Sequence, residues 1–560
     1  MNPTVVTPCL ILACCLAATS LTAAERLDRG LVALPTEDGV YLGWRLLADD
    51  PPDVAFTVFR RAPDERNYKR LNQQPLTAST NHLDTTAERD TTYSYCVVTR
   101  VGGKMREHAG PVQATAGADP KPYVTIPFQG DYRAQKVGIG DLDGDGQYEY
   151  VIKQPDFNTD PYQQPGYWKQ SEDTYKLEAY KQDGTLMWRH DMGWSIEEGI
   201  WYSPYIVYDL DGDGKAEVIT KAGEGDPREP EGHVKSGPEY LMVLDGETGR
   251  ERARTDWLSR DGFESYNYYC RNFLAIAYLD GQKPSIIMQR GTYTIIKIAA
   301  LDADLNQIWY WEASGDDARF RGQGAHTLQP ADIDGDGRDE LVIGSGAIDD
   351  DGKALWCTGL RHPDGMHVAD IDPDRPGLEV FYGIEPGRKE NAVCLVDART
   401  GEILWGYVGQ TRHVHGQGMC ADIIPDAPGM ECYAGEKDGS NYWLYSAKGE
   451  VLSKDKLGGL APPTAYWDAR PQKEIVLGGK IQQYQGEQYA RIEGRIIAIA
   501  DVLGDWREEI IASVNGELRL YTTTIPADTR RVCLMQNHLY RMGAATQSMG
   551  YWSQPQEGPQ

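Results

Sequence analysis

The chain contains 560 residues, of which 84 are Asp or Glu and 56 are Lys or Arg, so that its formal net charge is −28. A chain of this length can bury a large core and is expected to hold more than one domain. The excess of acid argues against nucleic acid as a partner, because phosphate binding needs a basic surface, and an anionic substrate would need a local cluster of cationic groups.

The first residues of the chain are apolar and rich in small side chains as far as Ala24, after which the charged pair Glu25 and Arg26 follows. This composition predicts a secretory signal peptide over residues 1–24, and hence a secreted, periplasmic or cell-surface protein. The stretch has no Lys or Arg before its apolar run, and the segment 11–14 (ILAC) leaves a lipoprotein anchor as the alternative. The rest of the sequence has no apolar run long enough to span a membrane.

Residues 25–118 contain short alternating segments separated by Pro, Asp and Gly, among them 39–44, 55–60 and 92–98. Such spacing is typical of a small β-sandwich resembling fibronectin type III. We see no catalytic constellation in it. A Gly- and Pro-containing linker then leads to a second domain, which we expect to occupy residues 119–560.

Three loops of the second domain carry carboxylates at alternate positions and are followed at once by β-rich runs. They read DLDGDGQYE, DLDGDGKAE and DIDGDGRDE, with acids at positions 1, 3, 5 and 9. Oxygens at alternate positions, a backbone carbonyl at position 7 and glycines at the sharp turns are typical of a calcium site. The predicted ligand positions are Asp141, Asp143, Asp145, Gln147 and Glu149; Asp209, Asp211, Asp213, Lys215 and Glu217; and Asp332, Asp334, Asp336, Arg338 and Glu340.

Looser copies of the loop extend the series. One of them predicts a fourth cation loop from Asp370, Asp372, Asp374 and Glu379, and the eight copies start at 141, 209, 278, 332, 370, 422, 466 and 501. The mean step of about fifty residues is that of propeller blades. With hairpin signals between the loops, the sequence predicts an all-β protein in which the sandwich precedes an eight-bladed calcium-binding β-propeller. The alternatives are an open β-solenoid and an array of separate calcium modules.

The loop direction predicts where a site would lie. If each first strand runs into its cation loop, then residues before the first strand or after the second come out on the opposite face. Basic and imidazole side chains gather at these positions, including five of the ten histidines. A single one of them is as typical of a solvated rim or of packing, but their convergence indicates a candidate active face. They are Lys221, Arg290 and Lys437 after second strands, and Arg321, His326, His362, His367, His413 and His415 before or within first strands.

Further motifs are spread along the chain: LDRGLV at 27–32, GIWYSP at 199–204, RGTYT at 290–294, RGQGAH at 321–326, GDWREE at 504–509 and YTTTIP at 521–526. Together with the DLDGDG loops they resemble the rhamnogalacturonan lyases of polysaccharide lyase family 11. The resemblance implies a small N-terminal β domain, the rhamnogalacturonan I lyase β-sheet domain, on an eight-bladed calcium-binding propeller. It also implies eliminative cleavage of the rhamnose–galacturonate backbone of pectin, an anionic plant polysaccharide.

One stretch departs from that family. Other members share an Asn-Gly-Thr-Lys run shortly before the last blade, whereas residues 488–495 read QYARIEGR here. The resemblance therefore leaves open the substrate subsites at this stretch, the exact uronate, and whether cleavage is endo or exo.

The chemistry of elimination selects the candidate residues. The C5 proton of a 4-linked galacturonate becomes acidic enough to remove once the adjacent carboxylate is neutralised by a metal, Arg or Lys. A base such as His or a desolvated Lys must then lie within reach. For proton transfer the candidates are His326, His367, His413 and His415, and for the carboxylate they are Lys221, Arg290, Arg321 and Lys437.

Two other classes of function stay open at this point, and we expect a monomer in each case. A glycoside hydrolase needs two carboxylates about 5 to 9 Å apart, and Glu224 with Glu436 is the pair on the candidate active face. A calcium-dependent propeller that serves only as an interaction protein would not need the basic and imidazole residues.

Overall fold

Runs of β-branched and aromatic residues between glycine turns favour strands. The computed structural model, which describes residues 25–558, consists almost wholly of antiparallel sheets, and the all-β prediction is confirmed. The predicted signal peptide at residues 1–24 lies outside the described residues. Within the described part, none of the helices combines the length and the apolar character that crossing a membrane would require.

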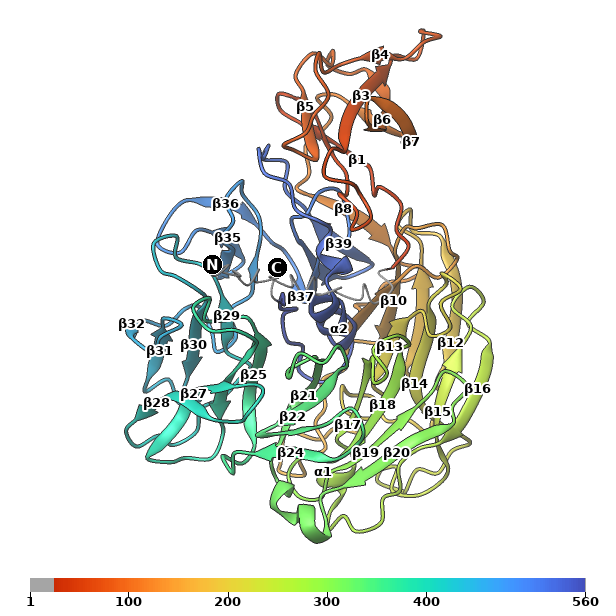
Figure 1. The fold of residues 1–560 in the computed structure, drawn as a ribbon. Helices are drawn as coiled ribbons and strands as arrows, with labels where there is room; N and C mark the ends of the chain where they lie inside the picture. Colours follow the sequence, from red (N-terminus) through yellow and green to blue (C-terminus); the bar gives the residue numbers. More distant parts are fainter. Residues whose placement is uncertain (1–24, 559–560) are drawn as a thin grey trace, which may run out of the picture.

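Two sheets form the N-terminal part, which stands apart from the main body in Figure 1. One contains β1 (Val32–Thr36), β2 (Gly39–Gly43) and β5 (Asn81–Asp84), and the other β4 (Lys69–Arg70), β3 (Ala55–Arg61), β6 (Thr92–Val101) and β7 (Lys104–Thr115). Side chains at alternate positions of both sheets share one buried core, which includes Leu42, Phe56, Val58, Tyr95 and Val97. The two sheets therefore pack face to face.

The following residues form eight four-stranded antiparallel sheets, and in the first seven the strands follow one another in chain order. Their bounds are β9 (Lys136–Gly140), β10 (Glu149–Gln154), β11 (Lys176–Tyr180), β12 (Leu186–Asp191); β13 (Tyr205–Tyr208), β14 (Glu217–Gly223), β15 (Glu239–Leu244), β16 (Glu251–Asp256); β17 (Asn272–Ala277), β18 (Ser285–Arg290), β19 (Lys297–Leu301), β20 (Gln307–Glu312); β21 (Gly324–Ala331), β22 (Glu340–Gly344), β23 (Gly346–Ile348), β24 (Ala354–Cys357); β25 (Pro363–Ala369), β26 (Glu379–Ile384), β27 (Glu390–Asp397), β28 (Ile403–Val408); β29 (Met419–Ala421), β30 (Glu431–Gly435), β31 (Tyr442–Tyr445), β32 (Val451–Ser453); and β33 (Thr464–Ala465), β34 (Glu474–Leu477), β35 (Lys480–Gln482), β36 (Gln488–Arg491).

The eighth sheet joins segments from both ends of the main body. It contains β37 (Arg495–Ala500), β38 (Glu509–Val514) and β39 (Glu517–Tyr521), and its fourth strand is β8 (Tyr123–Pro127). Strands β39 and β8 lie side by side in Figure 1 and pair antiparallel. The last sheet is thus held to the segment that precedes the first.

The repeated acidic loops all occupy the same place in their sheets. Each of the eight lies between the first and the second strand, for example between β9 and β10, or between β21 and β22. The loops therefore lie at the same ends of the first strands, as the loop-direction argument assumed.

A short helix that the sequence analysis did not predict lies among the first strands. Helix α2 (His538–Thr546) packs against β9, β13, β17, β21 and β37, and Figure 1 shows it inside the main body. Its Arg541 is buried, where it donates to the backbone carbonyls of Ile139 and Val207 and pairs with Glu25 at 2.7 Å. The remaining helices are α1 (Tyr266–Tyr269), η1 (Gly315–Phe320) and η2 (Leu534–Gln536).

A buried ionic network fastens the N-terminal sheets to the eighth sheet of the main body. Arg507 binds Asp505 through two hydrogen bonds of 2.9 and 2.7 Å, and Asp505 also accepts from Tyr41 at 2.9 Å and Asn81 at 3.1 Å. Burial by itself raises the pKa of Asp505, but Arg507 and the hydroxyl of Tyr41 hold it below its ordinary value. Asp505 is therefore a buried carboxylate that depends on its partners.

Replacement of Arg507 by Ala should leave that carboxylate buried without its counter-charge and destabilise the protein by about 3–5 kcal/mol. Thermal unfolding followed by circular dichroism measures the effect. Lys353→Ala is the control, since Lys353 pairs with Asp351 on the exposed surface, and it should leave Tm unchanged. Equal Tm values for the two variants would show that the network does not stabilise the junction.

Candidate active site

A carboxylate at the start of β25 is the centre of a histidine cluster. Oδ1 of Asp364 lies 3.2 Å from Nε2 of His326 and 3.5 Å from Nε2 of His362, and its Oδ2 contacts Nδ1 of His415. Asp364, His326 and His362 are buried. These side chains lie on or just before the first strands of three neighbouring sheets. The elements are β21, β25 and the segment before β29.

A second carboxylate completes the cluster. Glu385, which follows β26, lies 3.2 Å from Nε2 of His413 and 3.6 Å from Nε2 of His362. Nε2 of His413 is also 3.2 Å from Nδ1 of His415. We refer to the six residues His326, His362, Asp364, Glu385, His413 and His415 as the histidine cluster.

Burial and hydrogen bonding shift the pKa values of three groups in the histidine cluster. Burial, together with the neighbouring His362, lowers the pKa of His326 to about 4. Burial also lowers the pKa of His413. Although burial opposes it, hydrogen bonding to the surrounding imidazoles holds the pKa of Asp364 well below its ordinary value. Imidazole nitrogens and a carboxylate oxygen within 4.8 Å of one another are a donor set for a divalent cation.

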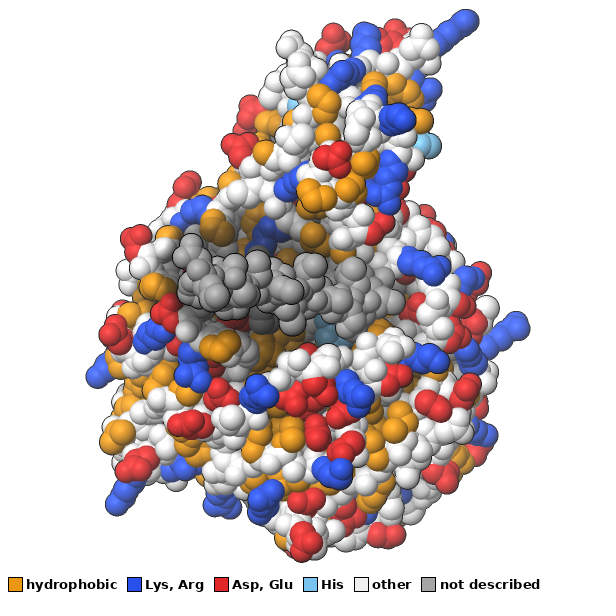
Figure 2. All heavy atoms as spheres, viewed as in Figure 1, with side chains coloured by type: hydrophobic (Ala, Val, Ile, Leu, Met, Phe, Trp, Pro, Cys, Tyr) orange, Lys and Arg blue, Asp and Glu red, His pale blue; other side chains and the backbone are white. Residues whose placement is uncertain are grey.

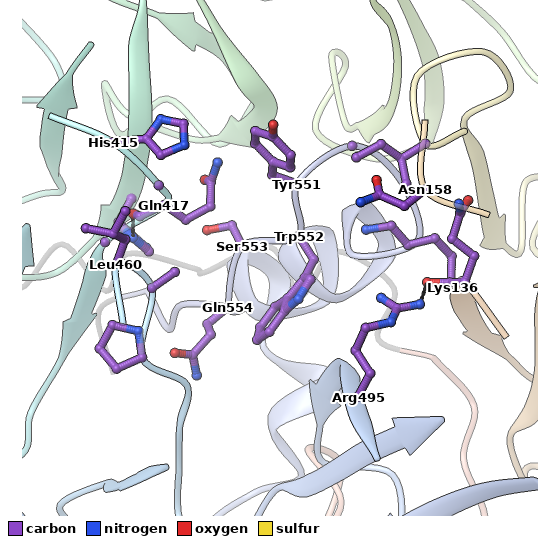
Figure 3. A pocket seen from close by; sticks show the side chains of 18 of the residues that line it. Lys136, Asn158, His415, Gln417, Leu460, Arg495, Tyr551, Trp552, Ser553 and Gln554 are labelled. Carbon is purple, nitrogen blue, oxygen red and sulfur yellow. Dashed lines mark hydrogen bonds between the residues drawn. The ribbon is translucent and has the colours of Figure 1, made fainter. Parts of the chain in front are cut away.

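A cavity of about 610 Å³ adjoins the histidine cluster. His415 belongs to both, and Gln417 on the cavity wall donates to the backbone carbonyl of Asp364 at 2.7 Å. Figure 3 shows Lys136 and Arg495 on the wall across from His415 and Gln417, with Trp552 between the two walls. The cavity thus combines cationic groups on one side, imidazoles on the other and an aromatic ring of the kind that packs against sugars.

Two of the predicted basic residues, Lys221 and Arg290, lie away from the histidine cluster and form ion pairs with an acid. Glu239 pairs with Lys221 at 2.8 Å, with Arg290 at 2.6 Å and with Arg260 at 3.0 Å, and the structure brings neither Lys221 nor Arg290 to the histidine cluster. Although burial opposes it, these cations lower the pKa of Glu239 to about 2. These cations are therefore compensated internally, by an acid on the sheet of Lys221, which adjoins the sheet of Arg290.

Arg321, Lys437 and His367 lie at the edges of the site. Arg321 lines a smaller cavity of about 320 Å³ together with His362 and Glu385. Lys437 is exposed, and its backbone amide donates to His413. His367 is buried on the wall of the large cavity, where Nε2 lies 2.7 Å from the carbonyl of Gln417 and where burial lowers its pKa to about 4.

The two carboxylates considered for a hydrolase differ in their surroundings. Glu436 accepts hydrogen bonds from the backbone of Arg412 and from the side chains of Ser440 and Asn441, while Glu224 is exposed. Sequence reasoning missed Asp364, Glu385, Lys136 and Arg495. The alternation of His362 with Asp364 at the start of a first strand is the one signal that could have revealed the cluster.

Among the cation loops, the one that begins at Asp332 has the donor set most suited to a cation. Oxygens of Asp332, Asp334 and Asp336 lie within 4.8 Å of one another, and within the described residues none of them, nor Glu340, forms an ion pair with a basic side chain. Oε1 of Glu340 is buried without a hydrogen-bond partner. Such hard oxygen ligands fit calcium.

Basic side chains approach the other loops. Lys181 contacts Asp143, Arg252 contacts Asp211 and Glu217, and Lys448 contacts Asp372 and Asp374. The first two loops still bring three acidic ligands together, Asp141 with Asp143 and Glu149, and Asp209 with Asp211 and Asp213. In all three complete loops, a backbone amide donates to the aspartate at position 5. The amides are those of Gln147, Lys215 and Arg338, and the aspartates are Asp145, Asp213 and Asp336. In the loop that begins at Asp370, the ammonium of Lys448 already supplies a positive charge.

The chain matches two family descriptions. "Rhamnogalacturonan lyase family 11, C-terminal domain" covers residues 120–558, and "Rhamnogalacturonan I lyases beta-sheet domain" covers residues 22–114. Two proteins of Bacillus subtilis (strain 168) are similar over 95% of this chain. They are the rhamnogalacturonan endolyase YesW, 37% identical over 90% of its length, and the rhamnogalacturonan exolyase YesX, 36% identical over 94% of its length.

Solved structures agree with the sequence comparisons. The crystal structure of exotype rhamnogalacturonan lyase YesX matches 95% of this chain and 96% of its own, with a TM-score of 0.87 and 33% identity. The rhamnogalacturonan lyase PL11 of Bacillus licheniformis matches 96% of both chains, with a TM-score of 0.84 and 34% identity.

Removal of divalent cations should lower Tm, and the decrease should be larger at pH 8 than at pH 6. Without a cation, burial and the nearby aspartates raise the pKa of Glu149 and of Glu340 to about 8. A raised pKa stabilises the folded state fully below the pKa of an unfolded Glu, and this contribution is lost as the pH rises through 8. Thermal unfolding in excess chelator, with calcium added back, measures the effect.

A matched pair of variants locates the effect. Asp334→Ala should lower Tm and reduce the response to chelator, whereas Asp426→Ala should change neither, because Asp426 is exposed in a loop that has Ile424 at the third position. If chelator leaves Tm of the wild-type protein unchanged at both pH values, these loops do not bind cations.

Proposed function

This chain belongs to rhamnogalacturonan lyase family 11 and is a polysaccharide lyase that cleaves the rhamnogalacturonan of pectin, and from this premise we propose how its residues carry out the reaction. The bond cleaved is the one to O4 of a galacturonate in the rhamnogalacturonan I backbone. Cleavage is a β-elimination that leaves an unsaturated uronate at the new end. The observation that carries this proposal is the junction between the histidine cluster and the large cavity, which meet at His415.

The histidine cluster is assigned to the substrate carboxylate. His326, His362 and His415 surround Asp364, and the imidazole nitrogens of the histidine cluster together with this carboxylate fit a divalent cation. When bound there, such a cation supplies positive charge next to the uronate carboxylate, which makes the C5 proton more acidic. Asp364 in turn orients the imidazoles and fixes which nitrogen of each ring is free.

This assignment changes the role of three predicted residues. His326, His413 and His415 were candidates for proton transfer, but each faces Asp364 or Glu385 within the histidine cluster. They are better suited to hold a cation than to remove a proton from carbon. The group that accepts the C5 proton must then lie on another wall of the cavity.

The substrate is assigned to the cavity. A sugar ring can stack on Trp552, while Arg495 provides a planar cation for a uronate carboxylate or for a hydroxyl group. Arg495 is held in place by Asp156 at 2.9 Å and by the backbone carbonyls of Ala134 and Gln135 at 3.1 and 2.9 Å. This guanidinium stands at the end of the stretch 488–495 that departs from the other family members, so the stretch contributes directly to the proposed subsite.

We propose the finer architecture on the same basis. The eight sheets are the blades of an eight-bladed propeller that follows a separate sandwich over residues 25–118, and calcium occupies the complete acidic loops. The packing of five first strands around α2 and the pairing of β39 with β8 support this arrangement. The sequence over residues 1–24 and a polymeric substrate support secretion or a cell-surface location. A monomer is sufficient, because one chain supplies every residue of the proposed site.

Incubation of the protein with rhamnogalacturonan I should generate the ultraviolet absorbance of an unsaturated uronate. The variant Asp364→Asn, which removes the central negative charge, should lower kcat/KM by about 10²-fold without unfolding the protein. Glu224→Gln is the matched control at an exposed carboxylate and should retain activity. A saturated reducing end, with no absorbance, would identify a hydrolase and would contradict the proposal.

A further inference from the structure

Lys136 is a buried lysine whose ammonium group does not face a carboxylate. It lies at the start of β9 and is 4% exposed. Its Nζ donates to the backbone carbonyls of Met549 at 3.3 Å and of Gln547 at 3.5 Å. Within residues 25–558, no carboxylate oxygen lies within ion-pair distance of it.

Other buried lysines differ from Lys136 in one respect or another. Lys221 pairs with Glu239 at 2.8 Å, and Lys473 pairs with Glu508 at 3.0 Å. Lys153 is buried, and within the described residues it has no carboxylate in ion-pair contact. It donates to the carbonyl of Ser203, but it does not line the large cavity. Lys136 is therefore the lysine on that cavity wall, and its nitrogen is not neutralised by an internal acid.

The surroundings of Lys136 favour the free amine. Burial lowers its pKa well below that of an ordinary lysine, and the like charges of Arg495 and Lys153 lower the pKa further, against a smaller opposing effect of Asp156. A lysine whose pKa is lowered in this way is a better general base than an ordinary lysine, because a larger fraction of it carries the free lone pair. Across the cavity stand His415 and Gln417.

We propose that Lys136 is the catalytic base that removes the C5 proton of the galacturonate bound in the cavity. The inference rests on the proposed function and deepens it. The lone pair of Nζ forms a bond to the C5 proton, and the electrons of the C5–H bond become the second bond between C4 and C5. The C4–O4 bond breaks with its electron pair on O4, which takes a proton from water. The ammonium of Lys136 then loses its proton to solvent.

The positions of the cationic groups fit this step. Arg495 on the same wall disfavours a second positive charge at Lys136 before the substrate enters, and the anionic substrate offsets the charge that forms on Nζ during proton transfer. The base and the histidine cluster approach the uronate from opposite walls, so that one wall takes the C5 proton while the other holds the carboxylate.

The variant Lys136→Met tests the assignment because methionine keeps the length and burial of the side chain but has no amine. Its kcat should fall by about 10³-fold, with KM changed much less, and small primary amines added to the assay should restore part of the rate. Lys297→Met is the matched control, since Lys297 is also buried, donates to the backbone carbonyls of Ser259 and Asp261 and does not line the large cavity, and it should retain kcat. The rise of kcat/KM with pH in the wild-type enzyme should disappear in Lys136→Met.

A labelling experiment on the wild-type protein covers the case in which Lys136→Met does not fold. At neutral pH a small acylating reagent should modify Lys136 in parallel with loss of activity, and an oligosaccharide substrate should protect both. Mass spectrometry of peptides locates the label. Activity that persists after Lys136 is acylated, or a folded Lys136→Met with wild-type kcat, would overturn the assignment. If the wild-type enzyme itself forms no unsaturated product, the proposed function fails instead.

Discussion

A buried glutamate at the start of the second strand is the constraint on which the architecture depends. In seven of the eight sheets its carboxylate accepts a hydrogen bond from a backbone amide of the loop before it; the residues are Glu149, Glu217, Glu340, Glu379, Glu431, Glu474 and Glu509. Such a bond fixes the loop against its own strand and satisfies an amide that would otherwise be buried alone. In the remaining sheet, Asp339 from the next loop accepts from Tyr278.

The same constraint explains why the loops need positive charge. A buried carboxylate is stable only when it is protonated, bound to a cation or paired with a basic side chain. Arg470 forms an ion pair with Glu474 at 2.9 Å, and Arg252 forms one with Glu217 at 2.7 Å. Glu340 has no such partner in the described chain. The glutamate is thus common to complete and incomplete loops, and a basic side chain reaches it in both kinds, as Arg252 and Arg470 show. The sheets are therefore alike in this hydrogen bond, while the group that offsets the buried charge differs from loop to loop.

The sequence predicted the repeated part of the fold and less of the rest. The eight acidic motifs all fall between a first and a second strand, because the motif is local and recurs with each sheet. Helix α2 and the pairing of β8 with β39 depend on contacts between distant segments, which no local pattern encodes. The site shows the same limit. Lys221 and Arg290 stand near strand ends as predicted, but their positions gave no sign that Glu239 on β15 would bind both of them, one from its own sheet and one from the next.

The arrangement also explains how a strongly acidic protein can act on a polyanion. The acidic loops lie at one end of the first strands and the cavity adjoins the other end, so a strand of five to six residues, roughly 17–20 Å, separates them. The Debye length at physiological salt is about 8 Å, so the field of the loops is largely screened at the cavity. The proposed subsite is local: Lys136 and Arg495 line one wall, and on the other lies a histidine cluster with the donor set for a divalent cation. The net charge of −28 therefore does not exclude an anionic substrate, because the groups proposed to bind it belong to the cavity wall and the histidine cluster, not to the acidic loops.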